Sequence, residues 1–179
     1  MIDPVIELSL RLALALLFGA AAWHKASDWI RFGAIVRSYR LLPSWLVAPL
    51  TWLLPGVEVL IAVGLLLPST RQVAAVGAAM LLLVYASAIG VNLARGRRDI
   101  DCGCSASSAH VPLSNWLVAR NAILIVAAFI LVMPARPRTL VWIDALTIMT
   151  AVTTLSLLWS AGQRLAGTGQ ALRRIGGAR

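Results

Sequence analysis

The chain has 179 residues, of which 60% are hydrophobic and 13% charged, and its formal net charge is +9. A soluble domain is typically about half apolar and about one quarter charged, so this composition excludes an ordinary soluble protein. The positive charge does not call for a nucleic-acid partner, because membrane topology and anionic lipid headgroups account for it.

Five apolar runs are long enough to cross a bilayer, which takes about 20 residues of helix. We predict transmembrane helices at Val5–Trp23, Trp45–Leu67, Gln72–Ala94, Ser114–Met133 and Leu140–Ala161. The first run follows an acidic leader, whereas a secretion signal begins with a basic one, so we expect it to be retained. Trp116 and four other tryptophans lie near the ends of these runs, as membrane anchors do.

A basic amphipathic helix is predicted over residues 27–40, between the first two spans. Its apolar residues recur at helical spacing on one face: Trp29, Phe32, Val36 and Tyr39. Ser27 is a suitable N-cap. Such a helix lies in the membrane interface, either as a cover of the bundle or as a lid over a substrate.

Arg11 and Glu58 are the ionisable residues deep inside the predicted spans. Counted from the interface that the first two spans share, both lie about 20 Å deep at a rise of about 1.5 Å per residue. We therefore predict a buried Arg11–Glu58 ion pair that fixes the helix register, since charges at this depth usually pair. The alternatives are a proton or ion path, or a group that binds quinone.

The segment "RGRRDIDCGCSASSAH" lies in the predicted loop 95–113 and holds both cysteines of the chain, Cys102 and Cys104. Gly103 between them permits the bend that a disulfide in so small a ring requires. Such a pair predicts thiol–disulfide exchange. Metal binding by Cys102, Cys104 and His110 is the main alternative, and an incidental pair is the other.

Polar residues at the loop end of the spans are candidates to line a pocket beneath the cysteines: Asn92, His24 and Lys25. Glycines inside the spans permit close helix packing, within the chain or between copies: Gly19, Gly64, Gly77 and Gly90.

The basic residues predict an orientation. Arg71, Arg136 and Arg138 lie on one side and Arg11 lies inside a span, so the remaining 12 of the 16 Lys and Arg residues share the side of the cysteine loop. The positive-inside rule then places the N-terminus outside and the cysteine loop in the cytoplasm.

Several short motifs follow one another in a characteristic order. They are "HK" (His24, Lys25), "F…YRLLP" (Phe32 to Pro43), "LPGVE" (ending at Glu58), "NLARGRRDIDCGC" (Asn92 to Cys104) and "W…RN" (Trp116, Arg120, Asn121). Over roughly residues 11–133 the chain thereby resembles the MauE branch of the DoxX-like membrane proteins. Family members often continue the cysteine motif with Phe-Gly, whereas Ser105 and Ala106 follow here, and the fifth span is additional to the family's four.

The resemblance implies a four-helix membrane bundle, with the cysteine motif before the fourth helix, and thiol redox chemistry with thioredoxin-like proteins. We therefore predict an all-α integral membrane protein with a four-helix domain over residues 1–133, a fifth transmembrane helix within 134–162 and a basic tail over 163–179. The expected location is a bacterial-type inner membrane. A periplasmic disulfide role would need the cysteines outside, opposite to the orientation that the charges predict.

The predicted function is that of a membrane thiol–disulfide oxidoreductase or electron-transfer subunit, with Cys102 and Cys104 as the redox pair. Arg120 and Asn121 would orient the loop or stabilise a thiolate. A membrane quinone is one candidate electron carrier. The alternative functions are a metal or thiol-compound carrier and a non-catalytic subunit that recruits a redox partner.

Overall fold

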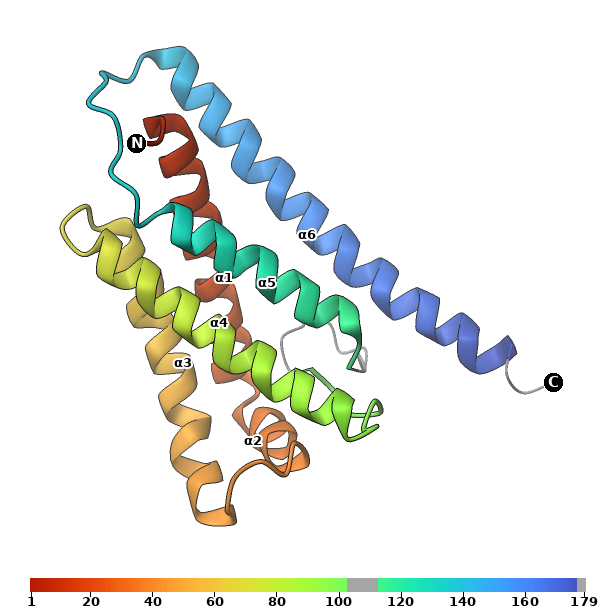
Figure 1. The fold of residues 1–179 in the computed structure, drawn as a ribbon. Helices are drawn as coiled ribbons and strands as arrows, with labels where there is room; N and C mark the ends of the chain where they lie inside the picture. The colour runs from red at the N-terminus through yellow and green to blue at the C-terminus, as the bar shows by residue number, and fades with distance from the viewer. Residues whose placement is uncertain (103–112, 177–179) are drawn as a thin grey trace.

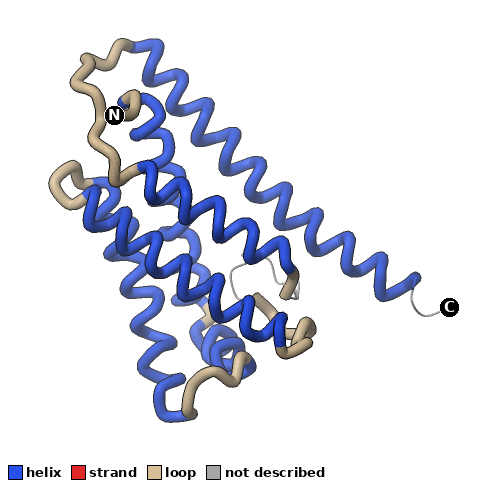
Figure 2. Tube along the Cα trace, viewed as in Figure 1, coloured by secondary structure: helices blue, strands red, loops and turns tan. Residues whose placement is uncertain are grey.

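The computed structural model of the chain describes residues 1–102 and 113–176, with side chains described as far as residue 162. These residues form six helices and no named strand (Figures 1 and 2). The helices are α1 (Pro4–Ser27), α2 (Trp29–Ser38), α3 (Ser44–Leu66), α4 (Arg71–Ala94), α5 (Asn115–Ile130) and α6 (Trp142–Gly176). The predicted all-α class is confirmed.

Helices α1, α3, α4 and α5 form a four-helix bundle. α1 packs against α3, α3 against α4, and α4 against α5, while α6 lies along α1 (Figure 1). The fully buried core of the bundle is built from Leu14, Phe18, Ile61, Leu65, Ala75, Ala78, Leu82, Ala128 and Leu131, among others. Large apolar side chains such as Leu60 and Val73 point outward, with 72% and 77% of their surface exposed. Extended exposed apolar surface of this kind is expected where helices face lipid.

Within the described part of the chain, four helices are long and apolar enough to cross a membrane: Pro4–Ser27, Ser44–Leu66, Arg71–Ala94 and Trp142–Gly162. The predicted span Ser114–Met133 is shorter in the structure, because the 16-residue α5 ends at Ile130. Pro134 prevents the helix from continuing, because it has no amide N–H to donate to the Ile130 carbonyl and its ring would clash with that carbonyl. The amides of residues 131–133 instead make the shorter bonds of a turn. At the other end of the chain, α6 continues to Gly176, so the segment predicted as a tail from residue 163 is largely helical.

The amphipathic helix is confirmed as α2, with shorter bounds than predicted. Asp28 separates it from α1, and the Asp28 carboxylate accepts a hydrogen bond from the Arg31 amide at 3.1 Å. The N-cap is therefore Asp28, whereas Ser27 is the last residue of α1. Phe32 on the apolar face is buried, and Trp29 stacks on Trp52 of α3 with ring centroids 5.4 Å apart.

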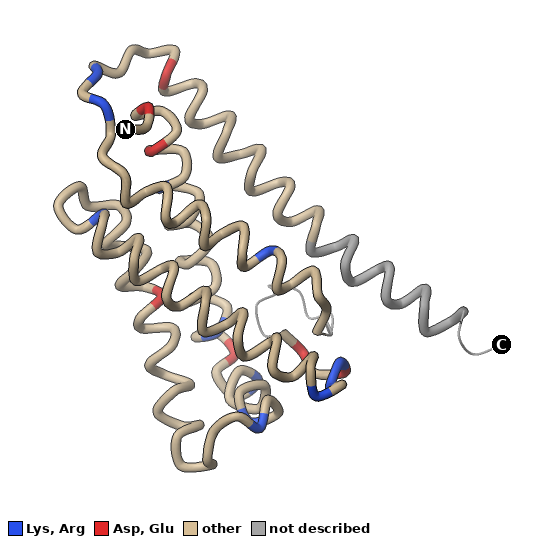
Figure 3. The backbone as a smooth tube through the Cα atoms, viewed as in Figure 1, with Lys and Arg blue, Asp and Glu red and all other residues tan. Residues whose placement is uncertain are grey.

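The charged residues gather mainly at the two ends of the bundle (Figure 3). At the N-terminal end, Ile2 forms a parallel bridge with Ala135, in the linker between α5 and α6. In the same linker, Arg138 donates hydrogen bonds to Asp144 and Asp3, and these contacts raise the pKa of its guanidinium. The opposite end carries α2 and the arginines that follow α4 (Figure 3).

The predicted Arg11–Glu58 ion pair is wrong. Arg11 instead contacts Glu7 at 3.0 Å and donates to the Leu66 carbonyl at 2.8 Å, and Arg71 joins Glu7 at 2.9 Å. Glu58 pairs with Lys25.

The register of α1 against α3 explains the error. The prediction counted depth from residues 24 and 45 as if both lay at the same membrane interface. In the structure the first turns of α3 extend beyond the end of α1. They run alongside α2, where Trp29 stacks on Trp52 and a Cβ on Gly33 would lie 3.4 Å from the Thr51 hydroxyl. Arg11 therefore lies level with the end of α3, and Lys25 reaches Glu58.

Two of the four glycines predicted to allow close packing do so. A Cβ on Gly64 of α3 would lie only 2.9 Å from the Ala74 Cβ of α4, and one on Gly77 would contact Ile61 at 3.7 Å. Gly19 and Gly90 have nothing within 4 Å of such an atom in the described part of the chain. Gly64 thus marks a close approach of α3 to α4.

Candidate functional site

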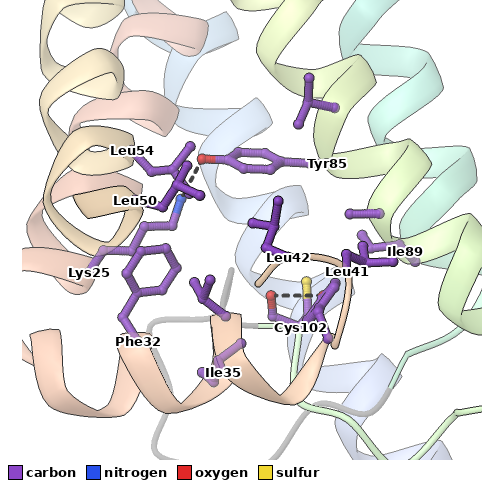
Figure 4. A pocket seen from close by; sticks show the side chains of 14 residues that line it. Lys25, Phe32, Ile35, Leu41, Leu42, Leu50, Leu54, Tyr85, Ile89 and Cys102 are labelled. Carbon is purple, nitrogen blue, oxygen red and sulfur yellow. Dashed lines mark hydrogen bonds between the residues drawn. The ribbon is translucent and has the colours of Figure 1, made fainter. Parts of the chain in front are cut away.

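An apolar pocket of about 150 Å³ lies between α2, α3 and α4 at the end of the bundle that carries the cysteine loop (Figure 4). Its apolar walls come from Phe32, Ile35 and Val36 of α2, Leu41 and Leu42 of the following linker, Leu50 and Leu54 of α3, and Val84, Ala88 and Ile89 of α4. Four lining residues carry polar side-chain atoms: Lys25, Tyr39, Tyr85 and Cys102. The pocket therefore combines a large apolar surface with a few placed polar groups, which is the usual composition of a small-molecule site.

Lys25 projects from the last turns of α1 into the bundle. Its ammonium forms an ion pair with the Glu58 carboxylate, and the two side chains are only 4% and 1% exposed. It also contacts the Tyr85 hydroxyl at 3.1 Å and lies 4.6 Å from the centre of the Tyr85 ring and 5.4 Å from that of Phe32. Burying a charge is costly unless it is paired, and these contacts supply the pairing.

Glu58 is satisfied on one side only. Its Oε1 accepts hydrogen bonds from Lys25 and from the Tyr85 hydroxyl, the latter at 2.8 Å. Its Oε2 is buried without a hydrogen-bond partner among the residues that the structure describes. A buried polar atom in this state calls for an explanation, since most such atoms are paired.

Cys102 is 7% exposed and lines the pocket, and Figure 4 shows it on the side opposite Lys25 and Tyr85. It packs with Ile89 of α4, Ile100 and Leu113 of the loop, and Leu117 of α5 in a small apolar cluster. The Tyr39 hydroxyl donates to the Cys102 carbonyl at 3.5 Å. The loop thus brings this cysteine against the bundle instead of leaving it in solvent.

Arg97 anchors the loop to the end of α2. Its guanidinium donates to the carbonyls of Ser38 at 2.8 Å and Tyr39 at 3.1 Å, and to the Asn92 side chain at 3.1 Å. Asn92 is fully buried and also bonds to the carbonyl of Ala88 within α4. Through these bonds Arg97 fixes the start of the loop against the helix that lines the pocket.

Two further contacts hold the loop. Arg31 of α2 pairs with Asp101 at 2.8 Å, directly before Cys102. The Leu113 amide donates to the carbonyls of Arg98 and Ile100, so the two ends of the loop lie side by side. Together these bonds set the position of Cys102 relative to α2.

The predicted supporting residues of α5 lie apart from this pocket. Arg120 and Asn121 are 8% and 2% exposed, and neither lines the pocket. Arg120 lies over the Trp159 ring of α6, 4.5 Å from its centre. Trp116 is 51% exposed, as expected of a membrane anchor. A direct role of Arg120 and Asn121 in orienting the cysteine pair stays a prediction.

The pocket is apolar, not polar as predicted. Of the three residues predicted to line it, Lys25 does so, Asn92 supports the loop beside it, and His24 does not, because its side chain is exposed on the outer face of α1. The cause is helical geometry, since adjacent residues of a helix point in directions about 100° apart. Cys104 and His110 lie outside the described residues, and the described part of the chain contains no group of three metal-ligating side chains.

The sequence analysis missed Tyr85 as a residue of the site. It also missed that Arg97 anchors the loop. Tyr85 is one of two tyrosines in the chain and lies inside an apolar span instead of at its end, where an anchor would lie. That position was a usable signal, because a phenol inside a span needs a buried partner.

Comparisons with known proteins agree with the fold and with the motifs. The family described as "Methylamine utilisation protein MauE" matches residues 3–134. Proteins named "Methylamine utilization protein MauE" are 44% identical over 124 residues in Paracoccus denitrificans and 37% identical over 171 residues in Methylophilus methylotrophus. The first alignment covers 69% of this chain and 67% of the relative, and the second covers 92% and 88%. No solved structure matches.

The helical bundle and its exposed apolar surface define a multi-pass membrane protein with a cysteine-lined apolar pocket. Within that class, the family match and the identities to several relatives are decisive. The chain belongs to the MauE family.

Proposed function

We propose that this protein is a membrane thiol–disulfide oxidoreductase that serves methylamine utilisation and exchanges disulfides with a thioredoxin-like partner through Cys102 and Cys104. The observation that carries the proposal is the placement of Cys102. It is held by a braced loop against an apolar pocket whose other side carries a buried ammonium. The names of the relatives supply the biological setting.

The burial of Cys102 assigns different roles to the two thiols. A protein partner cannot reach a sulfur on a residue that is 7% exposed and packed against Ile89 of α4 and Leu117 of α5. We therefore assign Cys104 to the partner and Cys102 to the resolving step. In this order Cys104 exchanges with the partner protein, and Cys102 closes the disulfide within the pair.

Disulfide exchange between the partner and the cysteine pair takes two steps. A thiolate of the partner attacks Cys104 of the Cys102–Cys104 disulfide, a mixed disulfide forms, and Cys102 leaves as a thiolate that takes up a proton. The partner's second thiolate then attacks the partner's first sulfur in the mixed disulfide. Cys104 is released as a thiolate and takes up a proton. Two electrons and two protons pass from the partner to the cysteine pair, and the same steps run in reverse when the partner is the oxidant.

Trapping tests the proposal. With Cys102→Ser, the remaining thiol should form a stable mixed disulfide with a co-expressed thioredoxin-like protein that lacks its own resolving cysteine. Cys104→Ser should trap far less, and the Cys102→Ser/Cys104→Ser variant is the matched control. If neither single variant captures the partner, thiol exchange is excluded, and preferential trapping by Cys104→Ser would reverse the assigned roles.

A further inference from the structure

Arg120 of α5 is a buried cation without a carboxylate partner. The residue is 8% exposed, and its Nε has no hydrogen-bond partner among the residues that the structure describes. All seven acidic side chains of the protein lie within the described residues, and none of them forms an ion pair with Arg120. A buried charge is costly unless it is paired. This guanidinium therefore calls for a counter-ion that no acidic side chain of the protein supplies.

A second buried donor lies at the same level of α5. Asn121 is 2% exposed, and its Nδ2 is likewise unpaired within the described part of the chain. The Arg120 guanidinium lies 4.5 Å from the centre of the Trp159 ring of α6, but a neutral ring does not cancel its charge. A guanidinium fork matches the geometry of a phosphate group, which it binds in a bidentate way.

The Arg120 site lies near the membrane interface, at the end of the bundle that carries the cysteine loop. Arg120 is five residues after the start of α5, which is about 8 Å along the helix. The 16 residues of α5 extend about 24 Å, whereas the hydrocarbon core of a bilayer is about 30 Å thick. A bilayer thins beside a helix that is too short for it, and this thinning brings lipid phosphates toward the level of Arg120.

An apolar crevice of about 410 Å³ lies between α1 and α6. Its lining residues are apolar except for Thr153, and two of them, Leu16 and Met149, are 56% and 68% exposed, so the crevice opens to lipid. Val152 of this lining and Trp159 are seven residues apart, which is about two helical turns, so they share one face of α6. The crevice therefore continues along α6 toward the ring that contacts Arg120.

α6 is loosely packed beside this crevice. Only 6% of its span is buried, against 33% for each of the spans in α1, α3 and α4. Within the described part of the chain, α6 packs along α1 but not along α5. An acyl chain in the crevice would increase the buried apolar surface of α6 and thereby hold it to the bundle.

We propose that an anionic phospholipid binds where α1, α5 and α6 meet, with its phosphate on Arg120 and an acyl chain in the crevice. The phosphate supplies the negative charge that the acidic side chains do not. The exposed arginines at the same end of the bundle, Arg37, Arg40 and Arg98, favour a headgroup with a net negative charge. This site is independent of the thiol exchange proposed above, because it uses neither cysteine.

Titration of the delipidated protein with phosphatidylglycerol, followed by native mass spectrometry, tests the headgroup contact. The wild-type protein should retain one phosphatidylglycerol, with at least about tenfold higher affinity than for phosphatidylethanolamine. Arg120→Gln should weaken this binding about tenfold, as expected for hydrogen bonds from a charged donor. Arg95→Gln removes the same charge from an exposed position and should leave the affinity unchanged. Equal affinities for the two lipids, or equal losses in the two variants, would overturn the proposal.

Two adjacent threonines of α6 test the place of the acyl chain. Thr153 lines the crevice, whereas the neighbouring Thr154 is exposed and does not line it. Thr153→Trp should fill the crevice and weaken phosphatidylglycerol binding, and Thr154→Trp should leave the binding unchanged. Glycerol 3-phosphate, which carries the phosphate without acyl chains, should not displace the lipid. Unchanged binding in Thr153→Trp, or displacement by glycerol 3-phosphate, would overturn the two-part site.

Unfolding temperatures separate lipid binding from a packing role of Arg120. A ligand that binds only the folded state raises the unfolding temperature, so phosphatidylglycerol should raise it in the wild-type and Arg95→Gln proteins but not in Arg120→Gln. Arg120→Lys keeps the charge and should recover part of the shift. If Arg120→Gln unfolds at a lower temperature but keeps the full lipid-dependent shift, Arg120 serves packing alone and the proposal is overturned.

The Cys102→Ser/Cys104→Ser protein separates a lipid phosphate from a thiolate as the counter-ion of Arg120. Its affinity for phosphatidylglycerol should equal that of the wild-type protein. Lipid binding that appears only after the cysteines are replaced would assign the counter-ion to a thiolate and overturn the lipid site. Partner trapping is measured separately, so a failure of the lipid site leaves the proposed thiol exchange untouched.

Discussion

Lys25 of α1 and Glu58 of α3 form an ion pair at the inner side of the pocket, with 4% and 1% of their side chains exposed. The pair connects two helices whose contacts are otherwise largely apolar, and it holds a positive group beside a cavity that faces Cys102. Such a pair sets the helix register and supplies a charge to the site at the same time.

Removing either partner of this pair should destabilise the protein strongly. Lys25→Met or Glu58→Gln alone leaves an uncompensated buried charge, so we expect a loss of about 3–5 kcal/mol in the free energy of unfolding. The Lys25→Met/Glu58→Gln double variant should recover most of that loss, because no charge remains buried. The free energy of unfolding of the three variants is measured in mixed micelles. A loss in the double variant equal to the sum of the two single losses would show that the residues do not act as a pair.

Loss of Arg97 should expose Cys102. Arg97→Ala removes three hydrogen bonds from a charged donor, each worth about 1.5–3 kcal/mol, and thereby frees the loop from α2. In a Cys104→Ser background, N-ethylmaleimide should modify Cys102 at least about tenfold faster, since about 1.4 kcal/mol corresponds to a factor of ten.

Arg95 provides the control for Arg97. It lies two residues earlier and is exposed, so Arg95→Ala removes the same charge without loosening the loop. The modification rate of Arg95→Ala should stay close to that of the parent. Equal acceleration by both substitutions would point to the local charge, not the bracing bonds, as the determinant of thiol reactivity.

Gly64→Ala should destabilise the contact between α3 and α4. The added methyl would lie 2.9 Å from the Ala74 Cβ, so one helix must shift, at a cost of about 1–3 kcal/mol. Gly56→Ala in the same helix meets nothing within 4 Å in the described chain and should stabilise the helix by up to about 1 kcal/mol. Thermal unfolding in detergent compares the two, and a stabilised Gly64→Ala would contradict the close approach.

The orientation predicted from the basic residues is tested by labelling in intact cells. In the Cys102→Ser/Cys104→Ser background, Ser69→Cys in the α3–α4 turn should react with an impermeant maleimide. Ala34→Cys on α2 should react only after permeabilisation. The reverse pattern would place α2 and the cysteine loop outside, where a periplasmic disulfide role requires them. The side of the membrane on which each position lies depends only on how α1, α3 and α4 cross it, so the shorter α5 does not affect the result.

The helices and the family were predictable from the sequence because both depend on local patterns. Long apolar runs mark α1, α3 and α4 directly, and the motifs from His24 to Asn121 identify the family without any three-dimensional information. Pairing was less predictable. The Arg11–Glu58 prediction assumed that the end of α1 and the start of α3 lie at the same level. In the structure the start of α3 extends past the end of α1 alongside α2, and no single residue of the sequence indicates that shift.

The pocket was also hidden, for a different physical reason. Its walls come from five separated segments, and its leucines, isoleucines and valines cannot be told from lipid-facing residues by type. His24 and Lys25 illustrate the limit at the level of a single step. Both are polar and adjacent, yet only the helix rotation decides that one points outward and the other inward.

The bridge between Ile2 and Ala135 bears on the order in which the protein is built. The Ile2 amide donates to the Pro134 carbonyl at 3.1 Å, and the Arg136 amide donates to the Ile2 carbonyl at 2.9 Å. These bonds join the start of α1 to the segment that follows α5, close to where the family match ends. During synthesis, the four-helix unit can therefore complete its backbone closure once residue 136 has emerged, before α6 is made. A bulky fusion placed directly before Ile2 would obstruct that closure, whereas one attached after α6 would not.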